Sequence, residues 1–135
     1  MARDKITVLK PVYDNSESVA TVKCTKQAVT QANGIEISKA FENKDNTLFI
    51  MIENTTTVSS AAADSSATIK AGNAYPNSML GDLSVTLEKS AITAIQIQDP
   101  SRFENADGSI CIDFASGFTG NIFAIAKRVG LKPIA

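Results

Sequence analysis

Apolar and polar residues alternate with a period of two through much of the chain. Residues 83–88 read LSVTLE and residues 110–114 read ICIDF, so in each segment the apolar side chains fall on one face. Residues 91–98 behave alike, with Ile95 and Ile97 on the inward face. This is the pattern of strands that bury one face in a core, and it predicts three such strands.

A second type of segment is continuously apolar. Residues 47–53 read TLFIMIE between polar neighbours, which predicts a central strand with both faces covered. Shorter strand candidates are residues 6–9, 20–24, 35–37, 67–71 and 121–127. Residues 27–32 and 61–66 are each expected to form at most a helical turn, since neither carries an apolar stripe.

Turn signals separate these segments at nearly regular intervals. Asn33-Gly34 is typical of a two-residue hairpin turn with positive φ at both residues. The series continues at residues 43–46, 72–73, 76–78, 81–82 and 107–108. Eight or nine short strands with such spacing predict an all-β fold, an antiparallel β-sandwich of the jelly-roll or Ig-like type. The length of 135 residues predicts a single domain over residues 1–135.

Two segments stand apart from this pattern. Residues 55–66, TTTVSSAAADSS, are expected to form a long hairpin connection or a flexible loop. Residues 1–15 are expected to form an extended N-terminal arm, because Lys10-Pro11 and the polar run 14–18 interrupt it. Its apolar residues Ile6, Val8 and Leu9 either cap this sandwich or add to a neighbour's sheet, and we favour the second alternative.

Composition narrows the function. The net charge is −1 and the 13 basic residues are scattered, with Lys127-Arg128 the longest basic run, so we expect no nucleic-acid partner. The apolar stretches are too short for a signal peptide or a membrane span. Cys24 and Cys111 are expected to be half-buried free thiols rather than a disulfide. The chain contains no histidine, which removes the commonest general base and metal ligand.

The candidate chemical motifs have structural interpretations. Asp113 lies between apolar neighbours, and its place in the alternation predicts a solvated outer face. Gly117 and Gly120 are expected to shape a tight connection, since the Lys and Ser/Thr of a phosphate loop are missing. Residues 104–109, ENADGS, resemble a calcium loop but lack the alternating carboxylates, and an Asp-Gly turn is the preferred interpretation. Asn54-Thr55-Thr56 matches the glycosylation pattern by accident.

For catalysis the sequence offers no complete set of groups. Ser78, Ser84 and Ser101 have neither a nucleophile-elbow setting nor a histidine to activate them. Paired carboxylates could come from Glu53, Asp82, Glu88, Asp99, Glu104 or Asp113, but the sequence does not show that any two converge. We therefore expect a protein that is not an enzyme, with no catalytic, cofactor or metal site.

Residues 70–128 resemble a known group of proteins. They contain KAGN, a proline turn, G-D-L-x-V-x-L, S-R-F-x-x-x-D-G-S-I-x-I-D-F and then G-F-T-G. This order is similar to that of small β-rich proteins encoded among the structural genes of tailed bacteriophages and prophages, which act as head decoration, cement or head-fibre proteins. The resemblance covers a little under half of the chain. It implies a β-sandwich in the virion that binds the major capsid protein or another virion protein as a homo-oligomer, for which a trimer is one option.

Two other classes of function remain open. One is an adhesive or carbohydrate-binding β-sandwich of a tail or host-receptor module, which would present exposed aromatics, with Tyr13, Tyr75 and Phe118 as candidates. The other is an enzyme that relies on carboxylates, which would need two of them within about 10 Å in a deep pocket.

Overall fold

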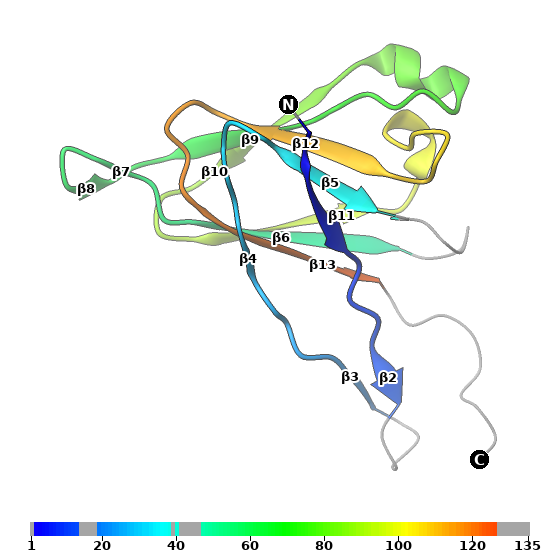
Figure 1. Cartoon of the computed structure of the whole chain (residues 1–135), viewed down its shortest axis with the longest axis horizontal. Helices are drawn as coiled ribbons and strands as arrows, with labels where there is room; N and C mark the ends of the chain where they lie inside the picture. Colours follow the sequence, from blue (N-terminus) through cyan, green and yellow to red (C-terminus); the bar gives the residue numbers. More distant parts are fainter. Residues whose placement is uncertain (1, 14–18, 39, 41–46, 127–135) are drawn as a thin grey trace.

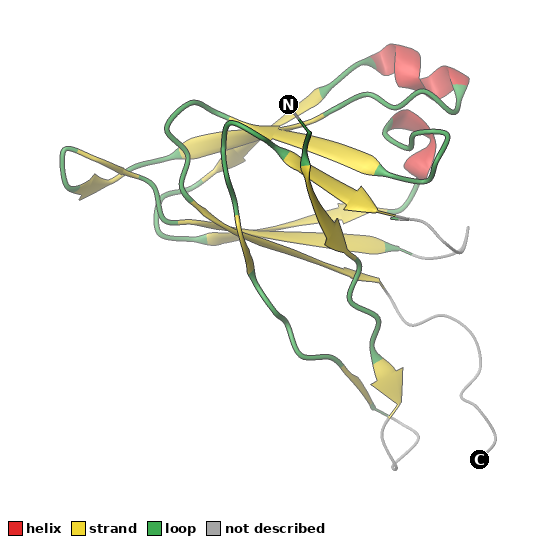
Figure 2. Ribbon diagram, in the orientation of Figure 1, coloured by secondary structure: helices red, strands yellow, loops and turns green. Residues whose placement is uncertain are grey.

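The computed structural model describes residues 2–13, 19–38, 40 and 47–126, and it shows an all-β protein. Two main sheets face each other as in a sandwich, and the only helices among these residues are two short 3-10 turns (Figure 2). The two sheets together hold nine of the described strands, which confirms the all-β sandwich predicted from the alternation.

The first sheet has five strands in the order β1-β5-β12-β9-β10. Their bounds are Asp4–Thr7, Ile35–Ser38, Ile110–Phe114, Ser65–Ile69 and Leu83–Leu87. Neighbours in this sheet run antiparallel except β1 and β5, which are parallel. The prediction of a purely antiparallel fold is therefore wrong for β1. A parallel pair needs a long connection, and residues 8–34 between β1 and β5 provide it.

The second sheet has four strands in the order β11-β6-β13-β4. Their bounds are Ile92–Ile97, Leu48–Asn54, Gly120–Ala126 and Gln27–Ala28, and all its pairs are antiparallel. The strand β4 lies where only a helical turn was expected. Its two residues pair with Asn121 and Ile122, and this tertiary pairing outweighs the weak local preference.

Two small ribbons and two turns complete the described chain. The ribbon of β2 (Val12–Tyr13) and β3 (Ala20–Thr21) extends away from the sandwich, as Figure 1 shows. A second ribbon, β7 (Thr57–Val58) with β8 (Ala61–Ala62), forms the hairpin expected within residues 55–66, so the helical turn expected at 61–66 is wrong. The 3-10 turns are η1 (Pro76–Leu80) and η2 (Pro100–Arg102).

The core between the sheets is built mainly from isoleucine, whose branched side chain suits a pleated surface. The inward alternation predicted for residues 110–114 holds, with Ile110, Ile112 and Phe114 all buried. The other fully buried large apolar side chains are Ile35, Ile37, Leu48, Ile50, Ile52, Ile69, Leu87 and Ile122. Both sheets contribute, so the core is one continuous layer between them.

The N-terminal residues cross from one sheet to the other. Ile6 is only 8% exposed, and β1 pairs with β5 over four residues. Leu9 then reaches β13: its N–H donates to the Ala124 carbonyl at 2.7 Å, and its carbonyl accepts from the Ala126 N–H at 3.0 Å. The favoured interpretation, that residues 6–9 add to a neighbour's sheet, is therefore wrong, because these residues close their own sandwich.

Several other sequence predictions need comment. Asn33-Gly34 connects β4 of one sheet to β5 of the other, so it is a turn between sheets and not a hairpin; Gly34 has a φ of +72°. Asp107-Gly108 likewise precedes β12 after a passage from the other sheet. The predicted turn at residues 43–46, the polar run 14–18, the pair Lys127-Arg128 and the Tyr13 side chain lie outside the described residues.

Candidate functional site

The outer face of the four-stranded sheet is apolar. Its three rows across β13, β6 and β11 are Asn121, Glu53 and Ile92; Phe123, Met51 and Ala94; and Ile125, Phe49 and Gln96. Six of these nine positions carry apolar side chains. We call the six residues Ile92, Phe123, Met51, Ala94, Ile125 and Phe49 the apolar sheet face.

The apolar sheet face is incompletely buried. Leu48, Ile50 and Ile52 on the inner side of β6 are fully buried, whereas Phe49 and Met51 on its outer side are only half-buried. At the strand edge Ile92 is 59% exposed. The continuous apolar run at residues 47–53 predicted a strand that is buried on both faces. In the structure only the inner face of β6 is fully buried. Contiguous apolar surface of this kind is characteristic of a binding interface.

The outer face of the five-stranded sheet has the opposite character. One row across it contains Lys5, Glu36 and Cys111, with the Lys5 ammonium 3.8 Å from the Glu36 carboxylate. The next row contains Asp113, Thr68 and Ser84. Polar and charged side chains are the usual content of a solvated sheet face. The two outer faces thus differ, and the apolar one is the candidate functional surface.

Asp113 lies on this polar face, as its place in the alternation predicted, and its carboxylate is partly exposed. The Arg3 guanidinium donates both to this carboxylate and to the Ile112 carbonyl, and the Lys70 ammonium lies 4.0 Å away. Gly34 leaves the space for Arg3, because a Cβ there would lie 2.5 Å from the guanidinium nitrogen. Asp113 therefore fixes the N-terminal segment to β12, a partnership across 110 positions that no local pattern indicates.

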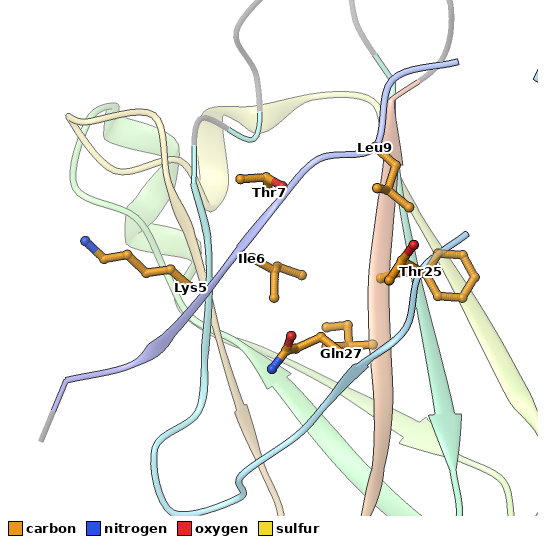
Figure 3. Close-up of a pocket in the computed structure, with 8 residues that line it drawn as sticks. Lys5, Ile6, Thr7, Leu9, Thr25 and Gln27 are labelled. Carbon is orange, nitrogen blue, oxygen red and sulfur yellow. The ribbon is translucent and has the colours of Figure 1, made fainter. Parts of the chain in front are cut away.

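Two of the grooves lined by described residues lie at the borders of the sandwich. The larger, about 440 Å³, lies where β6 leads into the β7-β8 ribbon, and Glu53, Thr55, Thr57 and Ile92 are among the residues that line it. The smaller, about 240 Å³, lies between β1 and β4 and is drawn in Figure 3. Glu53 and Ile92 also belong to the outer rows of the four-stranded sheet, so the larger groove adjoins the apolar sheet face.

Glu53 is the carboxylate at this border. Its Oε1 accepts a hydrogen bond from the Asn121 side-chain amide at 2.8 Å and one from the Lys26 ammonium at 3.1 Å. The Asn121 bond, followed by the Lys26 bond, lowers the pKa of Glu53 below its ordinary value of 4.5. The carboxylate is thus ionised at neutral pH and is held by Asn121 of β13 and by Lys26, which precedes β4.

Replacement of Asn121 by Ala is expected to raise the pKa of Glu53 toward its ordinary value, because the largest stabiliser of the ionised form is removed. Since the folded-state pKa is lowered, Glu53 contributes stability above its unfolded pKa, and that contribution is lost as the pH falls through the folded value. NMR titration of the Glu53 side-chain carboxyl carbon measures the shift, with Gln96→Ala as the control on the same face. An unchanged titration in Asn121→Ala would refute the assignment.

Three aspartates, of which Asp82 and Asp99 were candidates for paired carboxylates, serve the backbone of turns. Asp82, Asp99 and Asp107 accept hydrogen bonds from the N–H groups of Ala71, Ser101 and Ser109, at 2.7, 3.0 and 3.1 Å respectively. These N–H groups are the main reason that the pKa values of Asp82 and Asp99 are lowered. For Asp107 the Ser109 hydroxyl, at 2.6 Å, lowers the pKa most.

Residues 104–109, which resemble a calcium loop in sequence, form a turn. Asp107 is engaged by Ser109, and Asn105 donates from its side chain to the Ser109 hydroxyl at 3.3 Å, so the polar groups of residues 104–109 serve one another. In the part of the chain that the structure describes, no three Cys, Asp or Glu side chains are grouped so as to hold a metal ion.

Asn54 joins three segments from a buried position. Its side chain is 1% exposed, and its amide nitrogen lies 3.0 Å from the carbonyls of Ala63 and Leu87 and 3.2 Å from that of Glu88. Its side-chain oxygen accepts from the Thr56 N–H at 2.9 Å. The amide nitrogen that would carry a glycan faces the interior, so the match of residues 54–56 to the glycosylation pattern does not mark an accessible site.

The aromatic candidates for sugar stacking are dispersed. Phe118 is buried and stacks on Phe114 with ring centroids 4.6 Å apart, so it belongs to the core. Tyr75 is exposed but precedes η1, and it lines neither of the two grooves described. These two residues therefore do not form a joint platform.

The cysteines are both free thiols, as expected. Cys111 is half-buried, and burial raises the pKa of its thiol. Cys24 is exposed, so the expectation of burial was wrong for this residue, which lies between β3 and β4 outside the sandwich core.

No protein-family model, curated protein or solved structure matches this chain. Among the described residues no helix is long and apolar enough to cross a membrane. Sequence reasoning missed the apolar sheet face, although the unbroken run at residues 47–53 together with Phe123 and Ile125 carried its signal.

Proposed function

We propose that this protein is a non-enzymatic structural protein of a phage or prophage virion, a capsid decoration protein that stabilises the shell. The apolar sheet face is the observation that carries the proposal, with the major capsid protein as its partner. The resemblance of residues 70–128 to head-associated virion proteins supplies the choice of partner. The protein is made in the bacterial cytoplasm and acts in the virion.

The two outer faces suit such a role. Burying a large apolar side chain that is otherwise exposed contributes about 1.5–3 kcal/mol, and the half-buried residues of the apolar sheet face would each gain a part of this on docking. The polar face, with Lys5, Glu36 and Asp113, would then point to solvent and keep a decorated shell soluble. Many copies on one symmetric shell also gain affinity through avidity, so no single contact needs to be strong.

Charge placed on the apolar sheet face is expected to abolish shell binding. We expect the double variant Met51→Lys with Ile92→Lys to lose co-sedimentation with undecorated capsids of the encoding phage, because two ammonium groups would be desolvated at the interface. The matched control is Ser84→Lys, an exposed position on the polar face of the other sheet. Wild-type protein that fails to co-sediment well above micromolar concentration, or a double variant that binds as well as Ser84→Lys, would contradict the proposal.

Carbohydrate binding by an adhesive module is the second candidate. The larger groove favours it, since the Glu53 carboxylate and the hydroxyls of Thr55 and Thr57 are groups that bind sugar hydroxyls. Titration with host surface glycans, followed by NMR shifts of these threonine amides, separates the two functions: saturable shifts favour adhesion, and their absence leaves decoration as the explanation.

A further inference from the structure

A rigid apolar projection lies on one edge of the sandwich, in the connection that carries η1 into β10. Met79 is 91% exposed and Leu80 is 69% exposed, and Tyr75 and Leu83 beside them are exposed as well. We call these four residues the apolar knob. Four exposed apolar side chains within nine residues suggest a binding surface, and Met and Tyr are enriched at protein interfaces.

Hydrogen bonds hold the knob in place. The Arg102 guanidinium of η2 donates to three successive carbonyls, those of Leu80 at 3.5 Å, Gly81 at 2.9 Å and Asp82 at 3.1 Å. The Asp82 carboxylate, in turn, accepts from the Lys70 ammonium at 2.7 Å. A side chain presented from a fixed backbone loses less entropy on binding than one on a loose loop, so the knob is prepared for a partner.

The smaller groove offers a complementary hollow. Its apolar residues come from β1, β13 and the segment between β1 and β2, and they are Ile6, Leu9, Ile122 and Phe123. Lys5, Thr7, Thr25 and Gln27 are its polar lining residues, and Figure 3 shows Thr25 and Gln27 beside the space between β1 and β4, with the Lys5 side chain extending away from it. Its volume of about 240 Å³ is below the roughly 300–1,000 Å³ of sites for drug-sized ligands, so it suits one or two side chains. We call it the socket.

We propose that the knob of one copy of this chain enters the socket of a second copy. Knob and socket lie at opposite edges of the five-stranded sheet, because β10 and β1 are the two ends of its strand order. One copy can therefore use both at once, with two different neighbours. Such head-to-tail contacts close into a ring when the rotation between copies permits. The inference rests on the proposed function, which places many copies side by side on one shell. It adds the contact by which neighbouring copies bind each other.

One pair of charges fits the same pairing. Lys5, next to the socket, has a largely exposed side chain whose ammonium lies 3.8 Å from the Glu36 carboxylate of the same sheet. Beside the knob, η2 is preceded by Asp99, which is exposed and ionised at neutral pH, since the Ser101 N–H lowers its pKa. Opposite charges at the rim of an apolar contact orient the partners and speed their encounter.

The β2-β3 ribbon is the second part of the contact. A stable interface buries about 1,200–2,000 Å² in total, more than one knob and one socket supply. The ribbon lies within a few residues of the socket residues Leu9 and Thr25 along the chain, and Val12 of β2 and Val19, just before β3, are exposed. An isolated two-stranded ribbon is marginally stable in water, so a neighbouring copy against Val12 and Val19 would stabilise it.

Sedimentation equilibrium of the full chain without shells tests this proposal. We expect the wild-type protein to associate at micromolar to submillimolar concentration. Met79→Asp with Leu80→Asp (knob variant) and Thr25→Trp (socket variant) are expected to weaken association at least tenfold each. Gln27→Trp is a second socket variant, and Val58→Asp is the control, since Val58 is 62% exposed on the distant β7-β8 ribbon. All altered positions are exposed, so thermal unfolding should change little.

Mixing the knob variant with the socket variant separates this contact from every symmetric one. Each partner keeps one intact half, so a one-to-one complex of near wild-type affinity is expected, while each variant alone stays monomeric. A wild-type chain that remains monomeric at about 500 µM, knob variants that associate normally, or a mixture that stays monomeric would overturn the proposal. Shell binding is measured separately, so a wild-type chain that stays monomeric yet co-sediments with shells would reject this contact and leave the proposed function standing.

Discussion

A chain that begins at Pro11 is expected to lose several kcal/mol of unfolding free energy, enough to leave it largely unfolded near 37 °C. The deleted residues include Ile6, whose truncation to Ala alone should cost about 2–5 kcal/mol. They also include Arg3, which holds Asp113, and Leu9, which bonds to β13. Because natural domains are stable by only about 5–15 kcal/mol, the sum is comparable with the whole stability.

Thermal and urea unfolding followed by circular dichroism measure this effect. Two point variants accompany the deletion: Ile6→Ala should lower the melting temperature strongly, and Thr7→Ala, at the exposed neighbouring position, should leave it nearly unchanged. A truncated chain with the wild-type melting temperature would contradict this prediction, because it would show that the pairing of β1 with β5 contributes little to stability.

Substitution of Asn54 is expected to be among the most destabilising single changes in the chain. Its amide donates to the carbonyl of Ala63, which follows β8, and to that of Leu87, which ends β10, and its oxygen accepts the Thr56 N–H. Asn54 thus fastens β6 of one sheet to β10 of the other. Leaving a buried polar partner unsatisfied costs about 1–3 kcal/mol per group. Asn54→Leu should therefore cost about 3–5 kcal/mol, and Asn54→Asp more, since a carboxylate would face the carbonyl oxygens of Leu87 and Glu88.

Chemical unfolding of Asn54→Leu, Asn54→Asp and the exposed neighbour Thr55→Ala ranks these effects. The expected order of stability is Thr55→Ala, close to wild type, then Asn54→Leu, then Asn54→Asp. An Asn54→Leu variant as stable as the wild type would mean that the amide donors are unimportant, and it would reduce the role of Asn54 to the filling of space.

The strands that the sequence predicted best are those whose apolar alternation is complete within one segment. The strands β10, β11 and β12 lie within a residue or two of the predicted ranges, because their inward residues, such as Ile97 and Ile112, repeat at every second position. Partner choice was not predictable in this way. The parallel pairing of β1 with β5 depends on residues about thirty positions apart, and short edge strands such as β4 carry too few residues for a period.

The candidate surfaces were less visible in the sequence than the core. The sequence does not show that Met79 is exposed and that Ile6 is buried, because both are apolar residues in short segments. Their exposure depends on tertiary packing, of η1 against η2 and of β1 over the core. The apolar sheet face depends on the register of the strand pairs. Met51 belongs to an apolar surface because Phe123 of β13 lies beside it on one side and Ala94 of β11 on the other. Likewise the ion pair of Arg3 with Asp113 has no local signature.

The central claim is that the apolar sheet face binds a capsid shell. Cryo-electron microscopy of undecorated capsids of the encoding phage, incubated with the purified protein, tests it most directly. The account predicts ordered density on the shell, oriented with Phe49 and Met51 against the capsid protein and with the row of Lys5 and Glu36 toward solvent. Shells that remain bare at saturating protein, or density in which the five-stranded sheet faces the shell, would contradict it.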